Sequence, residues 1–306
     1  MLLYVKGLNV FYKNIVYLED INFQVNKGEI FSLVGESGSG KSLTALTLIN
    51  LLPEYFKAEG IVVFNGTEIL NLPSYQLEKI RGRKISIIFQ DPTTSLNPLI
   101  KVGTQIAEML IHHLNISKKE ALKKTKSILE KLKIPHTINS YPHQLSGGMK
   151  QRIMIAMAIA CEPELIIADE PTTALDVTVQ EEILDLLYYL VKSENKSLIL
   201  ITHDMNIVSE YADRVIVMYA GRIMEEGKVE DVYNNPYHPY TKALLSCIPS
   251  AKTEIMGIPG NIPNLKSLPK GCVFNPRCKY KQEICSKEIP TYRKVSDDRY
   301  VRCFFT

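Results

Sequence analysis

Apolar and polar positions in the first third of the chain are spaced as in β-strands. Residues 17–25 mix the two kinds loosely, and residues 29–34 form an apolar run that ends in glycines, as a buried strand entering a loop would. Residues 60–69 hold two apolar runs joined by Asn65-Gly66, a strong short-range signal for a β-hairpin. We therefore expect strands in all three places.

Helical spacing begins at Lys41, fades before Pro53, and returns between residues 92 and 161. Within that region residues 118–133 predict an amphipathic helix whose lysine-rich face is either a solvated surface, which we favour, or a nucleic-acid contact. Strands and helices then alternate, which indicates an α/β fold with a parallel sheet covered on both faces. The expected strands are 165–168, 197–201 and 215–218, and the expected helices are 177–191 and 205–212.

Composition limits the class of protein. Of the 306 residues, 45% are hydrophobic and 23% are charged, which is typical of a globular protein and excludes a disordered or fibrous chain. The longest uninterrupted apolar run, residues 153–161, is far shorter than the roughly 20 residues of a membrane span. The first residues lack the pattern of an export signal, so we expect neither a membrane span nor export.

Charge and cysteine are concentrated near the C-terminus. The net charge is only +3, but residues 266–302 contain ten Lys/Arg against four Asp/Glu. Cys161 lies in an apolar helical context and is expected in the core, as is Cys247. The other four cysteines can bind Zn²⁺ or a 4Fe-4S cluster as thiolates, the alternative being free thiols or disulfides. These four are Cys272, Cys278, Cys285 and Cys303. Composition places a domain boundary near residue 230.

Residues 35–42 fit the phosphate-loop pattern G-x-x-x-x-G-K-[ST], between an apolar strand and a helix. The glycines let main-chain N–H groups approach phosphate oxygens, and the helix N-terminus adds partial positive charge. Lys41 is expected to reach the β- and γ-phosphates of ATP, and Ser42 to bind Mg²⁺. The expected ATP contacts of this segment are Gly35, Ser37, Gly38, Ser39, Gly40, Lys41, Ser42 and Leu43.

Two adjacent carboxylates, Asp169 and Glu170, follow the apolar strand expected at 165–168. Ligands gather at the carboxyl ends of strands in open parallel sheets, so this position indicates function more than a solvated acidic pair. We expect Asp169 to hold Mg²⁺ and Glu170 to accept a proton from the attacking water.

A second glycine-preceded helix supplies a family resemblance. The string Leu-Ser-Gly-Gly-Met-Lys-Gln-Arg over residues 145–152 resembles the signature of ATP-binding-cassette (ABC) ATPases, and it lies between a phosphate loop and an acidic strand end in that family's order. The resemblance implies a head-to-tail pair of cassettes, in which Ser146, Gly147 and Gly148 bind the ATP held by the partner.

Further single residues match that family's motifs. By resemblance, Gln90 contacts Mg²⁺ and the water, His203 is the switch histidine at the γ-phosphate, and Asp176 lies in the loop that links the two half-sites. Tyr12 occupies the position of the aromatic that stacks on adenine, although Phe11 and Tyr17 lie close enough to compete for that role.

The C-terminal part is similar to the extension of oligopeptide and dipeptide importer ATPases. Residues 238–245, 258–260 and 269–278 carry that resemblance. It implies a cassette fold at 1–230, with a mixed-sheet core, an antiparallel β subdomain and a helical subdomain at about 92–160. An irregular extension follows at 231–306, and the resemblance favours the 4Fe-4S cluster over zinc.

The implied function is ATP hydrolysis that powers peptide uptake at the cytoplasmic face of the cell membrane. The implied partners are a second, different ATPase chain, two transmembrane permease subunits and, indirectly, an extracytoplasmic substrate-binding protein, with no nucleic acid. Importers of nickel or metallophore complexes are close relatives and remain an alternative. A soluble ABC ATPase that acts on nucleic acid is a second alternative, supported by the lysine-rich stretch and the basic C-terminal part.

Overall fold

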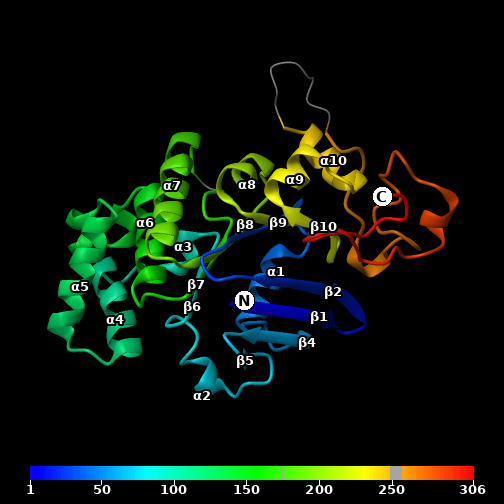
Figure 1. Cartoon of the computed structure of the whole chain (residues 1–306). Helices are drawn as coiled ribbons and strands as arrows, with labels where there is room; N and C mark the ends of the chain where they lie inside the picture. Colours follow the sequence, from blue (N-terminus) through cyan, green and yellow to red (C-terminus); the bar gives the residue numbers. More distant parts are fainter. Residues whose placement is uncertain (174, 249–256) are drawn as a thin grey trace. The chain divides into compact units, whose positions relative to one another are not determined.

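The computed structural model describes residues 1–173, 175–248 and 257–306. These residues form two compact units, one of Met1–Asn71 with Ile201–Thr306 and one of Leu72–Leu200. We call them unit 1 and unit 2, and describe each by itself (Figure 1). The boundary expected near residue 230 stays a prediction.

Unit 1 contains an antiparallel sheet with the strand order β2-β1-β4-β5. Its strands are β1 (Leu3–Tyr12), β2 (Ile15–Val25), β4 (Lys57–Phe64) and β5 (Thr67–Glu68). Positive φ angles of 46° at Asn65 and 82° at Gly66 form the turn between β4 and β5, which confirms the predicted hairpin. The strand expected at residues 17–25 is confirmed as part of β2.

The second sheet of unit 1 has the order β11-β12-β10-β9-β3. Its strands are β3 (Ile30–Val34), β9 (Arg214–Tyr219), β10 (Arg222–Lys228), β11 (Arg293–Ser296) and β12 (Arg299–Val301). The pair β3 and β9 is parallel, whereas β9, β10, β12 and β11 pair antiparallel in turn. The sheet is therefore mixed rather than parallel throughout, and β11 and β12 bring strands into a segment that was expected to be irregular.

The helices of unit 1 are short. They are α1 (Lys41–Leu48), α8 (Met205–Tyr211), α9 (Val229–Asn234) and α10 (Pro239–Ser246), with 3₁₀ turns η3 (Leu265–Ser267) and η4 (Glu283–Ser286). Tyr219 of β9, Tyr240 of α10 and Phe274 bury their rings against one another in one apolar cluster. The C-terminal residues therefore share a core with the sheet strands of unit 1.

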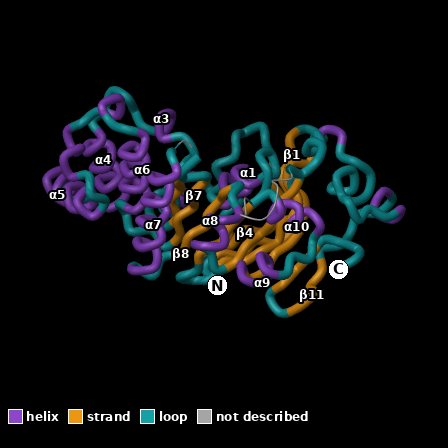
Figure 2. Tube along the Cα trace, turned by 90° about the horizontal axis from the view of Figure 1, so that it is seen from above, coloured by secondary structure: helices purple, strands orange, loops and turns teal. Residues whose placement is uncertain are grey.

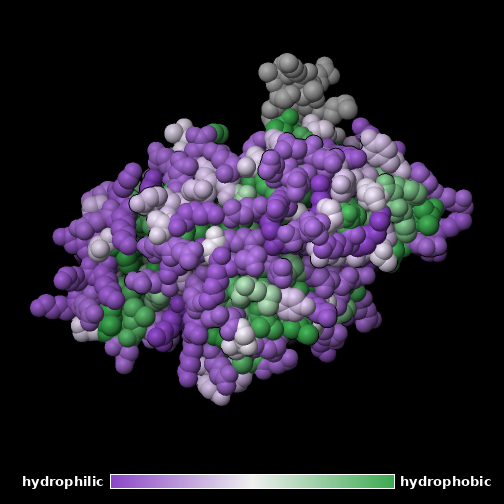
Figure 3. All heavy atoms as spheres, in the orientation of Figure 1, coloured by the Kyte–Doolittle hydropathy of each residue, from purple (hydrophilic) through white to green (hydrophobic). Residues whose placement is uncertain are grey.

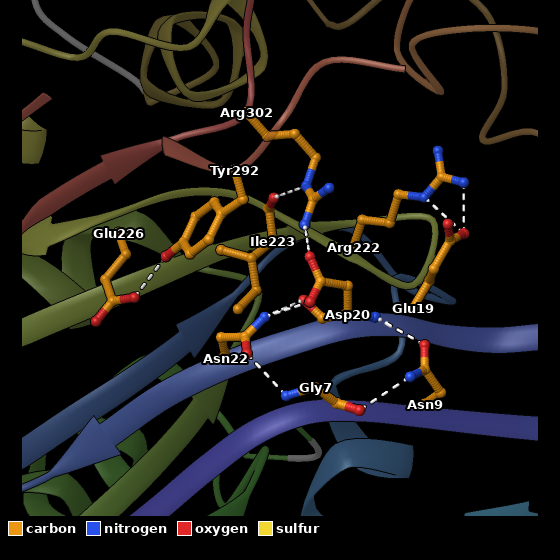
Figure 4. A network of polar contacts seen from close by, with 10 residues as sticks. All are labelled: Gly7, Asn9, Glu19, Asp20, Asn22, Arg222, Ile223, Glu226, Tyr292 and Arg302. Carbon is orange, nitrogen blue, oxygen red and sulfur yellow. Dashed lines mark hydrogen bonds and ion pairs between the residues drawn. The ribbon is translucent and has the colours of Figure 1, made fainter. Parts of the chain in front are cut away.

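Polar contacts also join the C-terminus to the strands of unit 1, as Figure 4 shows. Arg302 donates to the Asp20 carboxylate at 3.0 Å and to the main-chain oxygen of Ile223 at 3.1 Å. The Tyr292 hydroxyl donates to the Glu226 carboxylate at 2.5 Å. These contacts link three segments that are far apart in sequence.

Unit 2 is mainly helical, with α4, α5 and α6 side by side in Figures 1 and 2. Its helices are α2 (Ser74–Leu77), α3 (Pro92–Ser95), α4 (Val102–Leu114), α5 (Lys118–Lys131), η1 (Pro135–Asn139), η2 (Pro142–Gln144), α6 (Gly147–Ile159) and α7 (Val177–Ser193). Its strands are β6 (Ile85–Ile88), β7 (Leu165–Asp169) and most of β8 (Ser197–Thr202). The strands β6 and β7 are parallel, so their carboxyl ends meet at one edge.

The predicted amphipathic helix at 118–133 is confirmed as α5, which buries Ala121, Thr125 and Leu129 and leaves all six of its lysines exposed. The face of the molecule drawn in Figure 3 is mostly hydrophilic, with apolar side chains in small groups. Among the described residues no helix is long and apolar enough to cross a lipid bilayer.

Candidate functional site

The glycine-rich loop of residues 35–40 joins the fully buried strand β3 to α1 in unit 1. Two of its glycines have little space for a side chain. A Cβ on Gly35 would lie 2.2 Å from the main-chain oxygen of Met218, and a Cβ on Gly40 would lie 2.6 Å from Cδ2 of Leu18. Gly40 is the N-cap of α1 with a φ of 103°, and no side chain caps the helix. The helix start therefore presents main-chain N–H groups in the manner of an anion site.

Lys41 places a cation inside this loop. Its side chain is buried, and Nζ donates hydrogen bonds to the main-chain oxygens of Gly35 at 2.8 Å and Glu36 at 3.1 Å. Ser42 follows as an exposed residue in the first turn of α1. Of the other expected ATP contacts, Ser37 and Gly38 are exposed, Ser39 is buried and Leu43 is half-buried. The loop thus combines an ammonium group and a hydroxyl with a helix N-terminus, which suits a phosphate ligand.

Tyr12, at the end of β1, belongs to an aromatic group that sequence analysis did not identify. Its ring centroid lies 5.2 Å from that of Tyr55 and 5.7 Å from that of Phe56, while Tyr17 lies 5.1 Å from Phe56. Tyr55 is 61% exposed, so the group offers an open aromatic surface. Tyr55 and Phe56 follow α1 in an irregular segment, where no periodic pattern singles them out.

Unit 2 brings Gln90 and Glu170 together. Gln90 follows β6 and Glu170 follows β7, and Nε2 of Gln90 donates to Oε2 of Glu170 at 3.0 Å. The Thr173 hydroxyl donates to the same oxygen at 2.8 Å, a contact that the sequence pattern did not indicate. Glu170 also has a φ of 45°, a left-handed conformation that is uncommon outside glycine and often found at functional sites. Two donors therefore fix the orientation of this carboxylate.

Asp169 is the last residue of β7 and is only 7% exposed. A buried carboxylate at a strand end is the hard oxygen ligand that Mg²⁺ prefers, and a serine hydroxyl such as that of Ser42 is a second. The oxygen donors that the chain offers thus suit Mg²⁺. In unit 1 His203 is exposed and follows β8 directly, one residue before Asp204, which is the N-cap of α8.

The signature string lies at the start of α6 in unit 2. Ser146 is the N-cap, and its Oγ accepts from the Met149 N–H at 3.3 Å. A Cβ on Gly148 would lie 2.7 Å from Cγ1 of Val179, and Val179 N–H donates to the Asp176 carboxylate at 3.0 Å. The structure therefore packs the start of α6 against the start of α7, which brings the signature and the Asp176 loop together within one unit.

The prediction of a metal site at the four C-terminal cysteines is wrong. Cys272, Cys278, Cys285 and Cys303 line one cavity of about 290 Å³. All four are free, and in the described part of the chain no group of three or more His, Cys, Asp or Glu side chains is arranged to hold a metal ion. Burial raises the pKa of Cys272 to about 11 and also raises the pKa of Cys278. Because these side chains are not arranged as a ligand set, neither the 4Fe-4S cluster nor Zn²⁺ is supported.

Comparison with protein families agrees with this geometry. Residues 18–173 match the family described as ABC transporter, and residues 224–285 match the family described as oligopeptide/dipeptide transporter, C-terminal region. The first match contains the phosphate loop and the signature, and the second overlaps the C-terminal segment that carried the subfamily resemblance.

Individual relatives match nearly the whole chain. The oligopeptide transport ATP-binding protein OppD of Escherichia coli (strain K12) is 48% identical over 313 aligned residues, which cover 99% of this chain and 93% of that protein. The dipeptide transport ATP-binding protein DppD of Haemophilus influenzae is 47% identical, with 94% and 88% covered. A solved dimeric post-hydrolysis structure of the ATP-binding cassette MJ0796, bound to ADP and Pi, is 31% identical with a TM-score of 0.67, and the match covers 74% of this chain and 98% of that one.

Proposed function

We propose that this chain hydrolyses ATP to power peptide uptake. The chain belongs to the ABC transporter family, and it is similar over its length to oligopeptide and dipeptide transport ATP-binding proteins. The observation that carries the proposal is the buried Lys41 ammonium, held among the main-chain groups of a glycine loop between β3 and α1. Such a loop serves to bind a nucleoside triphosphate. The relatives favour peptide transport over the nickel-complex and nucleic-acid alternatives.

We propose that unit 1 and unit 2 each supply side chains that bind the nucleotide or Mg²⁺. Unit 1 supplies the loop amides and Lys41 for the phosphates, and Tyr12 for the adenine ring. Ser42, Gln90 and Asp169 would hold Mg²⁺, which neutralises charge on the phosphate oxygens when bound.

Glu170 is the proposed general base. It accepts a proton as a water oxygen bonds to the γ-phosphorus, and the bond from that phosphorus to the β–γ bridging oxygen breaks, which releases ADP and phosphate. Gln90 and Thr173 orient the Glu170 carboxylate through its Oε2. His203 is the proposed contact to the γ-phosphate.

The chain is proposed to work in an assembly of several subunits. Ser146, Gly147 and Gly148 cap the nucleotide of a second ATPase subunit in a head-to-tail pair, and Asp176 links the two half-sites. The solved dimeric cassette among the structural relatives supports such a pair. The second ATPase is proposed to be a different chain, and two membrane-embedded permease subunits receive the work at the cytoplasmic face. A substrate-binding protein delivers the peptide to them from the other side.

The test of this function is Glu170→Gln in the assembled transporter. We expect ATP binding to be retained and phosphate release to fall by a factor on the order of 10² to 10³, because the general base is lost. ATP-driven accumulation of a labelled tripeptide in proteoliposomes should stop as well. Glu164→Gln, just before the other end of β7, is the matched control and should leave turnover unchanged. Undiminished phosphate release by Glu170→Gln would refute the assignment.

A further inference from the structure

An ion pair joins the C-terminal segment to the phosphate loop. Arg277 Nη1 donates to Oε2 of Glu36 at 2.7 Å, and Nη2 donates to Oε1 at 3.0 Å. Glu36 is the second residue of the glycine loop, and 241 positions separate it from Arg277. The Arg277 side chain is 4% exposed and that of Glu36 is 28% exposed, so the pair is largely screened from water. A bidentate guanidinium–carboxylate pair in such a place fixes both partners in direction.

Arg277 is itself held on every part of its guanidinium group. Nε donates to the main-chain oxygen of Pro259 at 3.0 Å, Nη2 to that of Ile258 at 3.2 Å, and Nη1 to the Tyr219 hydroxyl at 3.3 Å. The group also lies 5.7 Å from the centre of the Tyr219 ring. Arg277 is therefore a rigid anchor rather than a mobile surface arginine.

Glu36 is held at its main chain too. Its N–H donates to the Tyr240 hydroxyl at 3.0 Å, and its oxygen accepts from Nζ of Lys41 at 3.1 Å. Tyr240 is fully buried in the cluster that also contains Phe274. One loop residue thus connects the C-terminal segment with the lysine that is proposed to bind phosphate.

The contact with Arg277 compensates the negative charge of the Glu36 carboxylate. A carboxylate within an anion-binding loop repels phosphate and works against the positive charge of Lys41 and of the helix start. The Arg277 guanidinium compensates the charge of the Glu36 carboxylate through hydrogen bonds of 2.7 Å and 3.0 Å. It also restrains a glycine-rich loop whose ordering would otherwise cost conformational entropy when nucleotide binds.

We propose that Arg277 is a positioning residue for the phosphate loop, which compensates the charge of Glu36 and holds the loop ready for ATP. The inference rests on the proposed ATP site. It gives the C-terminal extension a role in nucleotide affinity, in addition to its packing within unit 1.

The experiment measures Kd for Mg-ATP on the full-length chain with a fluorescent ATP analogue. Arg277→Met keeps an apolar stem beside Tyr219 but removes the charge, and we expect Kd to rise about tenfold or more. Glu36→Gln with Arg277→Met removes the uncompensated carboxylate, so we expect Kd to return to within about threefold of the unsubstituted chain. Arg277→Lys, which keeps a charge without the bidentate geometry, should give an intermediate Kd.

Arg302→Met is the matched control, since Arg302 also joins the C-terminal segment to a carboxylate and a main-chain oxygen, but outside the loop (Figure 4). It should leave Kd unchanged. Unchanged Kd in Arg277→Met, or a double variant that binds as weakly as the single one, would overturn the proposal. If Arg277→Met does not fold, Arg277→Lys decides the question, because an unchanged Kd there is equally contrary. Failure of the unsubstituted chain to bind ATP, or equal binding by Lys41→Ala, would instead refute the proposed function.

Discussion

At the scale of single residues, the phosphate loop contains glycines of two kinds. Gly35 is required by packing, because a Cβ there would lie 2.2 Å from the main-chain oxygen of Met218, whereas Gly38 has a φ of 80° and open space around it. We expect Gly35→Ala to lower the free energy of unfolding by about 3 kcal/mol or more, through steric overlap. Gly38→Ala should cost only about 1 kcal/mol, from backbone strain. Urea unfolding measures both, and equal losses would contradict this distinction.

His238 makes stability depend on pH. It is fully buried as the N-cap of α10, and its Nδ1 accepts from the Tyr240 N–H at 3.0 Å. Burial lowers its pKa from 6.5 to about 3, so between these values only the unfolded chain binds the proton. Stability is therefore lost as pH falls below 6.5, by about 2 kcal/mol on reaching pH 5.

His238→Asn keeps a capping acceptor but does not titrate in this range, and should remove that part of the decline. The measurement is the free energy of unfolding in urea at pH 7 and pH 5 for both chains. Parallel declines in the two chains would show that His238 does not carry the effect.

At the scale of elements, two helices begin with the same cap but are expected to differ in function. Ser146 Oγ accepts from the Met149 N–H at the start of α6, and Ser117 Oγ accepts from the Glu120 N–H at the start of α5, both at 3.3 Å. Replacing either serine by alanine should cost about 1 kcal/mol of stability. Only Ser146→Ala should also lower the ATPase rate of the assembled transporter, since Ser146 is proposed to touch the partner's nucleotide. Equal ATPase rates in the two variants would remove the signature role.

Sequence patterns predicted elements that depend on local spacing. The hairpin at 60–69 follows from Asn65-Gly66. The hydrogen bond between Gln90 and Glu170 was not predicted, because it depends on the pairing of β6 with β7, which local spacing does not report. The strands β11 and β12 were missed, because they are short and only three of their seven residues are apolar or aromatic. Their stability comes from the pairing of β12 with β10 and of β11 with β12 rather than from their own pattern. The link from Arg277 to Glu36 was missed because 241 positions separate the two residues and nothing near either one indicates the other.

At the scale of the whole molecule, the C-terminal extension belongs to the same compact unit as the phosphate loop. Unit 1 joins Met1–Asn71 with Ile201–Thr306, so the chain leaves this unit and returns to it. The cysteines of the extension illustrate the limit of a spacing argument. They do gather around one cavity, as their clustering suggested, but no three of these four side chains are arranged to hold a metal ion, and sequence spacing does not report that arrangement.

If the extension is part of this unit, shortening it should destabilise the chain rather than release a separate domain. Removal of residues 299–306 deletes β12 and removes Arg299, the ion-pair partner of Glu225. The two side chains of this pair are 5% and 0% exposed. A buried carboxylate that loses its partner costs about 3 to 5 kcal/mol, and we expect the midpoint of urea unfolding to fall accordingly. Removal of residues 305–306 alone is the control, because Phe305 is 48% exposed and lies outside β12. A chain without residues 299–306 that unfolds at the same urea concentration as the full chain would mean that the core of unit 1 is complete without its last strand.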